Sequence, residues 1–177
     1  LDLPDGTLEV RDGSIVSVGR GRKHDFDLRP NLLIPGFVDT HRHMWQGLLR
    51  NIGPDDLLLD YLNKVLFGLA PKLTPDEVYL GDLITALSAV NSGITCILDW
   101  SHIQANPEYT DAAIQALQES GLRAVFAYGP VWYEAPKPEH PEWFRQTAKK
   151  YFSSKDQLLT FGLAAFGPEF NSVEGNV

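Results

Sequence analysis

The sequence predicts an α/β fold in which strands of a parallel sheet alternate with helices. Four apolar runs are separated by segments with the helical period, and they cover residues 32–39, 94–100, 122–128 and 158–165. Strands that are almost continuously apolar are typical of a parallel sheet covered on both faces. No Gly-x-Gly-x-x-Gly or Gly-x4-Gly-Lys-Ser/Thr motif follows any of these runs, so the nucleotide-binding form of an open sheet has no support. A barrel and a doubly wound sheet both fit this pattern.

A short β-hairpin is predicted ahead of the first apolar run. Residues 7–18 form two alternating runs with Asp12-Gly13 between them, and this dipeptide is the strongest local signal for a tight hairpin turn. Two strands of this size do not form a stable domain by themselves. We therefore expect a small unit over residues 1–34 and a main domain over residues 35–177.

The first long helix has the clearest boundary signals. Thr74 can act as its N-cap and Glu77 completes a capping box, while Gly93 can supply the left-handed residue that ends it. Two further helices are predicted over residues 106–120 and 141–152. The apolar residues of the first helix recur on one face, at Leu80, Leu83, Ile84, Leu87 and Val90.

Composition and charge exclude several classes of protein. The chain has 177 residues, with 15 basic and 23 acidic side chains and a net charge of −8, and neither sign is clustered. A nucleic-acid-binding protein or a membrane-surface protein is therefore not expected. No apolar run approaches the ~18 residues of a membrane span, and no secretory signal is visible. A single cysteine, Cys96, cannot form an internal disulfide, which favours a cytoplasmic location.

Two histidines directly follow the first apolar run and form a candidate metal site. In an extended chain the side chains of His41 and His43 point to the same face, so both imidazoles can reach one ion. Zinc and iron accept neutral imidazole nitrogen. Asp39 lies on the same face and could orient a ligand or hold a proton. The alternative is that both histidines are hydrogen-bonded inside the fold without a metal.

The same segment carries a family resemblance. Residues 35–47, PGFVDTHRHMWQG, resemble the first-strand signature of the amidohydrolase superfamily, in particular its cytosine-deaminase-like and triazine-hydrolase-like branch. Residues 73–79 resemble the first long helix of that family and residues 93–102 resemble its second strand. The resemblance implies a partial (β/α)8 TIM-type barrel containing about strands 1–4. Residues 1–34 would then belong to a flanking β-sandwich, and residues 35–177 would form the first half of the barrel.

The resemblance also implies a chemistry. His41 and His43 match two metal ligands of the family, for zinc or alternatively iron or manganese. A metal-activated water would attack a ring carbon or carbonyl of a small nitrogen heterocycle or amide and release an amine. Asp39 would support the ligands without being the catalytic acid or base. The residues expected to face the small-molecule substrate are Trp45, Gln46, Asp99, His102 and Glu169.

The length of the chain limits this expectation. A full (β/α)8 barrel needs ~250 residues, and the family takes further ligands from histidines after strands 5 and 6 and an aspartate after strand 8. Alternatives are a truncated, metal-free binding, lyase or isomerase-type relative and a structural or oligomerisation module. Because half a barrel exposes two unpaired strand edges, we expect a homo-oligomer or a pairing with a complementary barrel half.

Overall fold

The computed structural model divides into two compact units, Leu1–Pro35 and Gly36–Val177. The residues that it describes are 3–20, 23–134, 137 and 139–167. The smaller unit contains β1 (Gly6–Arg11) and β2 (Ser14–Arg20), which pair antiparallel. Between them Asp12 has φ 49° and Gly13 has φ 72°, the left-handed values that a two-residue type I′ turn requires. The predicted hairpin is thus confirmed.

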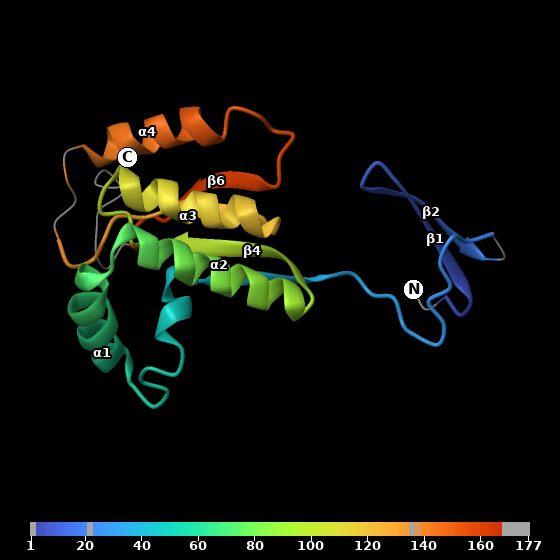
Figure 1. The fold of residues 1–177 in the computed structure, drawn as a ribbon, viewed down its shortest axis with the longest axis horizontal. Helices are drawn as coiled ribbons and strands as arrows, with labels where there is room; N and C mark the ends of the chain where they lie inside the picture. Colours follow the sequence, from blue (N-terminus) through green and yellow to red (C-terminus); the bar gives the residue numbers. More distant parts are fainter. Residues whose placement is uncertain (1–2, 21–22, 135–136, 138, 168–177) are drawn as a thin grey trace. The chain divides into compact units, whose positions relative to one another are not determined.

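The larger unit is a four-stranded parallel sheet covered by helices. Its strands are β3 (Phe37–Arg42), β4 (Ile94–Ser101), β5 (Arg123–Tyr128) and β6 (Leu159–Leu163), paired in the order β3-β4-β5-β6. The connecting helices are α2 (Pro75–Asn91), α3 (Pro107–Ser120) and α4 (His140–Tyr151). These helices lie side by side over one face of the sheet (Figure 1). Each strand is added next to the preceding one, which is the arrangement of a (β/α)8 barrel and not of a doubly wound sheet. The predicted α/β partial barrel is confirmed.

One predicted boundary differs from the structure. The first barrel strand starts at Phe37, whose N–H donates to the Gly93 carbonyl, and not at residue 32. Pro35 has no N–H to give to a sheet, and Leu32 is 83% exposed. The segment from residue 44 to residue 72 is largely helical. It contains the 3-10 helix η1 (Met44–Leu49), α1 (Leu58–Tyr61), the π-helix η2 (Leu62–Leu69) and the 3-10 helix η3 (Ala70–Lys72).

The predicted start of α2 is confirmed in atomic detail. The Glu77 N–H donates to Thr74 Oγ1 and the Glu77 carboxylate accepts from the Thr74 N–H, which completes the capping box. Gly93 follows the helix with φ 81°. The buried face of α2 contains Val78 and four smaller residues, Gly81, Asp82, Ala86 and Ala89. Its large apolar side chains lie on a different face and are exposed, at Leu80, Ile84, Leu87 and Val90.

The core of the larger unit lies between the sheet and the helices. Phe126 on β5 stacks with Phe161 on the neighbouring β6 and with Phe152, and Ile97 and Leu117 are fully buried in the same cluster. The two outer strands β3 and β6 each leave one edge unpaired within the described sheet. Among the described residues, no helix has both the length and the apolar character to cross a membrane.

Candidate metal and substrate site

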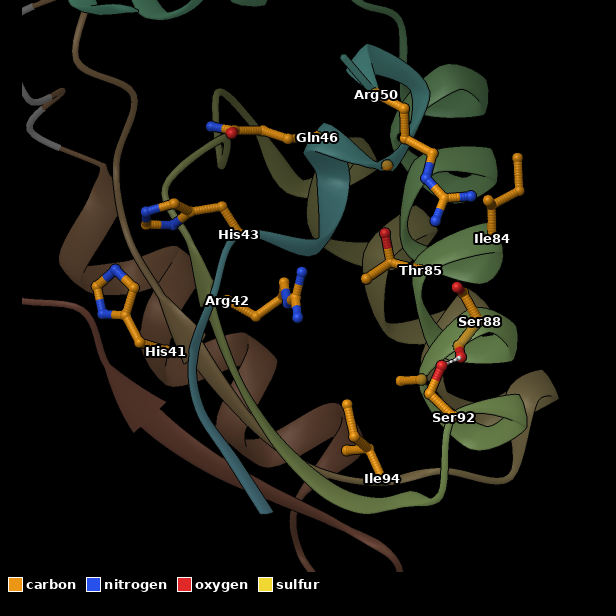
Figure 2. Close-up of a pocket in the computed structure, with 12 residues that line it drawn as sticks. His41, Arg42, His43, Gln46, Arg50, Ile84, Thr85, Ser88, Ser92 and Ile94 are labelled. Carbon is orange, nitrogen blue, oxygen red and sulfur yellow. Dashed lines mark hydrogen bonds between the residues drawn. The ribbon is translucent and has the colours of Figure 1, made fainter. Parts of the chain in front are cut away.

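The two predicted histidines come together at the carboxyl end of β3. Their ring centroids are 5.1 Å apart, and Figure 2 shows both imidazoles on one side of the strand, with Arg42 on the side toward α2. His43 Nδ1 lies 2.9 Å from the Trp100 carbonyl oxygen on β4. Because a carbonyl only accepts, Nδ1 carries the hydrogen and Nε2 keeps its lone pair. Burial chiefly lowers the pKa of His43, so its neutral, ligand-competent form is favoured.

His102 is a third imidazole at this position. Its ring centroid is 4.3 Å from that of His43, and its Nδ1 lies 3.1 Å from the same Trp100 carbonyl oxygen. The side chain is buried, and this burial, followed by the proximity of His43, lowers the pKa of His102 to about 4. His102 is therefore neutral at physiological pH and can donate through one ring nitrogen and accept through the other.

Trp45 and Gln46 follow the histidine pair in η1. Trp45 is completely buried and its ring meets His102 edge-on, with centroids 5.5 Å apart. Gln46 Nε2 donates to the Tyr61 hydroxyl oxygen over 2.6 Å, which ties its amide to the end of α1. Both histidines and Gln46 line a cavity of about 540 Å3. Other residues around this cavity are Arg42, Gly47, Arg50, Ile84, Thr85 and Ser88 (Figure 2).

Asp39 supports the end of β3. Its Oδ2 accepts from Nε and Nη2 of Arg42 over 2.9 and 2.6 Å, and its Oδ1 accepts from the His41 N–H. Burial raises the pKa of this carboxyl, but the hydrogen bonds from Arg42 and His41 outweigh it and the net pKa is lowered. The ionised carboxylate thus holds the backbone that carries His41.

Asp99 lies behind the turn that follows His43. It is fully buried, and its Oδ1 accepts from the Met44 N–H over 3.0 Å. Burial is the main cause that raises its pKa, to about 7. The structure therefore gives Asp99 a contact with the protein backbone, and a contact with substrate stays a prediction. Glu169 lies outside the described residues.

Sequence reasoning missed four groups that shape this site. Three of them belong to no sequence motif. The Trp100 carbonyl oxygen lies within hydrogen-bonding distance of two imidazoles, and the Tyr61 hydroxyl accepts from Gln46. Thr85 Oγ1 donates to the Met44 carbonyl over 2.9 Å. The fourth, Asp82, is fully buried on α2. The sequence gives no signal for its burial, because a residue two positions from Leu80 and Ile84 lies on the opposite side of the helix from that apolar stripe, where an exposed carboxylate is expected.

The histidine pair fits a divalent metal as part of a ligand set. It offers two neutral imidazoles at the end of a parallel strand, and the hydrogen bond of His43 leaves the lone pair on Nε2. Within the part of the chain that the structure describes, no group of three or more His, Cys, Asp or Glu side chains is arranged to hold a metal ion. The two imidazoles are thus the donors that this region contributes.

Relatives among characterised proteins carry deaminase names. The chain is 32% identical over 139 residues to the 5'-deoxyadenosine deaminase of Methanosarcina barkeri, covering 75% of this chain and 31% of that protein. It is 28% identical over 169 residues to the 5-methylthioadenosine/S-adenosylhomocysteine deaminase of Syntrophomonas wolfei, covering 92% of this chain and 38% of that protein. The chain therefore spans about a third of the length of these relatives.

Solved structures agree in fold. Guanine deaminase from C. acetobutylicum matches with a TM-score of 0.74 at 24% identity, over 91% of this chain and 41% of that chain. A triazine hydrolase variant matches with a TM-score of 0.68 at 20% identity, also over 91% of this chain and 41% of that chain. The model of the Amidohydrolase family matches residues 32–174, which includes the histidine pair and the whole four-stranded sheet. The chain belongs to the amidohydrolase family.

Proposed function

We propose that this chain supplies the amino-terminal part of a metal-dependent hydrolase that deaminates, or otherwise cleaves a C–N bond of, a small nitrogen heterocycle. The observation that carries the proposal is the His41–His43 pair, whose second member is fixed by the Trp100 carbonyl with Nε2 available. The deaminase names of its relatives support the substrate class. Because the chain spans about a third of those relatives, the proposal requires the remaining part of the barrel for a complete active site.

The chemistry follows from this donor set. His41 and His43 would hold a divalent metal, with zinc favoured and iron or manganese as alternatives. When bound, the cation would supply the activation of water for attack on an electrophilic ring carbon. Two solved relatives are named with zinc, an adenosine deaminase from Xanthomonas campestris and an atrazine chlorohydrolase from Arthrobacter aurescens.

The chain's own residues would bind and orient the heterocycle. His102 would lie beside the bound ring next to His43, and the fully buried Trp45 would hold the His102 imidazole in place through its edge-on contact. Gln46, held by the Tyr61 hydroxyl, would present its amide carbonyl to an N–H of the substrate. Neutral His102 would offer a hydrogen bond without a charge. Asp99 and Glu169 are proposed as further contacts with the substrate.

Location and assembly complete the proposal. We infer a cytoplasmic location from the single cysteine, Cys96. The unpaired edges of β3 and β6 would be covered by a complementary barrel half or by a second copy of the chain. Phe37 and Val38 on β3 are 58% and 63% exposed, which supports a partner that covers the faces of this outer strand.

Zinc binding tests the proposed function. Titration of the metal-free chain with Zn²⁺ against a chromophoric chelator is expected to show a zinc site that is lost in the His41→Ala/His43→Ala double variant. The apparent affinity should fall by more than about 100-fold, since the loss of even an outer hydrogen-bond partner of a ligand costs 10–100-fold. Elemental analysis of the purified protein gives a second readout.

Variants of distant histidines are the controls. His24→Ala and His140→Ala should bind zinc like the wild type, because neither residue lies at the carboxyl end of β3. Equal zinc binding by the double variant would contradict the assigned ligands. A wild-type chain that takes up no zinc under any loading condition would favour the metal-free binding, lyase or isomerase-type alternative.

A further inference from the structure

Two hydrogen bonds fix the peptide groups that follow His43. The Met44 N–H, which belongs to the peptide bond with His43, donates to Asp99 Oδ1 over 3.0 Å. The Met44 carbonyl accepts from Thr85 Oγ1 over 2.9 Å. Met44 is completely buried, so water does not readily replace either partner when a bond is lost. The turn after His43 is thus held by β4 on one side and by α2 on the other.

The position of the His43 ring depends on this turn. The ψ angle of His43, 89°, sets the direction in which the Met44 N–H points toward Asp99. The His43 carbonyl accepts from the Gln46 N–H over 3.1 Å. At the other end of the residue, Nδ1 lies 2.9 Å from the Trp100 carbonyl oxygen. Because a hydrogen bond weakens steeply when its distance and angle change, a displacement of the turn also disturbs the bond of the ring.

Two glycines, one on each element, allow α2 to approach the turn closely. A Cβ on Gly81 of α2 would lie under 3.0 Å from the Trp45 carbonyl oxygen. A Cβ on Gly47 of η1 would lie under 3.0 Å from both Thr85 Oγ1 and the Gly81 carbonyl oxygen. Thr85 follows Gly81 by four residues and therefore lies on the same face of α2. The close approach brings its hydroxyl within reach of the Met44 carbonyl.

The hydroxyl of Thr85 has a local alternative that it does not use. A threonine within a helix can donate to a carbonyl three or four residues earlier in the same helix. A hydroxyl has one hydrogen to donate, and that of Thr85 goes to the carbonyl of Met44 on a different element. This bond therefore connects α2 to the turn and does not serve the helix itself.

We propose that Thr85 is a positioning residue for His43, which it reaches through the Met44 carbonyl. Thr85 ties the turn to α2 while Asp99 ties the same turn to β4. Together they keep the His43 ring on the Trp100 carbonyl, with the Nε2 lone pair available. The use of His43 as a metal ligand rests on the proposed function, whereas the position of its ring does not.

The peptide group between Met44 and Trp45 can be observed alone. Methionine precedes tryptophan once in this sequence, so labelling with ¹³C-carbonyl methionine and ¹⁵N-tryptophan gives a single carbonyl–amide correlation. Thr85→Val replaces the hydroxyl with a methyl group and is expected to shift this signal, because the Met44 carbonyl loses its donor. Thr85→Ser keeps a hydroxyl and should return the signal toward its wild-type position. This readout tests the hydrogen bond in solution.

The ¹⁵N signals of the His43 ring test the positioning role. In the metal-free wild type we expect His43 to carry its hydrogen on Nδ1, as a bond to the Trp100 carbonyl requires. Thr85→Val should move these signals toward those of a mixture of both tautomers, and Thr85→Ser should restore them. Zinc affinity should fall by about 10-fold in Thr85→Val, the lower end of the effect of groups that support a ligand, and recover in Thr85→Ser.

Two variants away from the turn are the controls. Thr160 on β6 also donates its hydroxyl to a main-chain carbonyl, that of Ala124, over 3.5 Å. Ile114 on α3 is fully buried, and its truncation to valine lowers stability to a degree similar to the loss of one hydrogen bond. Thr160→Val and Ile114→Val should both keep the wild-type signals of the His43 ring and the wild-type zinc affinity.

The outcomes separate this inference from the proposed function. Unchanged His43 ring signals in a folded Thr85→Val variant overturn the positioning role, even if stability falls. If Thr85→Val does not fold, Gly81→Ala displaces α2 from the same turn, and unchanged ring signals in that variant overturn the proposal. A chain that binds no zinc, but whose ring signals change in Thr85→Val and return in Thr85→Ser, contradicts the proposed function and supports the role of Thr85.

Discussion

Trp45→Ala is expected to lower the free energy of unfolding of the larger unit by about 3–5 kcal/mol. The Trp45 side chain is completely buried in the core cluster and its ring contacts His102 edge-on. Truncation to alanine removes this contact area and leaves a cavity next to the histidine pair. Urea unfolding followed by circular dichroism measures the loss.

Trp45→Phe is the matched variant for this prediction. Trp45 Nε1 is buried without a partner, so phenylalanine removes an unsatisfied donor while it keeps most of the apolar surface. We expect Trp45→Phe to cost less than Trp45→Ala, since a phenyl ring leaves a smaller cavity than a methyl group does. Equal losses in the two variants would show that the indole N–H, and not the ring volume, determines the stability at this position.

Gly81→Ala is expected to destabilise the chain by about 1–3 kcal/mol although alanine is the better helix former. The new methyl group would overlap the Trp45 carbonyl oxygen, a backbone atom that no rotamer change can move. α2 must then shift away from η1, and the hydrogen bond from Thr85 to Met44 lengthens. Thermal unfolding measures the loss of stability. The backbone amide signal of Met44, the one methionine of the chain, in a ¹⁵N-methionine-labelled sample reports the change at the hydrogen bond from Thr85.

Gly162→Ala is the control for the glycine prediction. A Cβ at Gly162 on β6 would lie 3.5 Å from the nearest side-chain atom, which is ordinary van der Waals contact. This variant is therefore expected to change stability by less than about 0.5 kcal/mol. A stable Gly81→Ala variant with an unchanged Met44 signal would contradict the close docking of α2 on the turn.

Elements with strong local signals could be predicted from the sequence. Asp12-Gly13 determines the hairpin turn, and the Thr74 capping box determines where α2 begins, because both depend on groups within a few residues. The buried face of α2 could not be predicted in the same way. Its packing depends on how closely the helix approaches η1, so small residues such as Gly81 are buried while larger ones such as Leu87 remain exposed.

The candidate site could be predicted only in part, because some of its contacts depend on local sequence and others on the three-dimensional fold. The spacing of His41 and His43 along an extended strand places both rings on one side, and the structure shows this. The hydrogen bond from His43 Nδ1 to the Trp100 carbonyl depends on the pairing of β3 with β4 and on a main-chain atom that every residue has. The contact of Asp99 with the Met44 N–H likewise requires the three-dimensional fold.

The central claim is that His41 and His43 bind a divalent metal through a geometry that the Trp100 carbonyl sets. Its most direct test is the ¹⁵N spectrum of the imidazole nitrogens with and without Zn²⁺. We predict that zinc shifts the signals of both histidines, with coordination at Nε2 of His43 while Nδ1 of His43 keeps its hydrogen. Zinc-dependent shifts confined to His24 and His140, or coordination through Nδ1 of His43, would contradict the account.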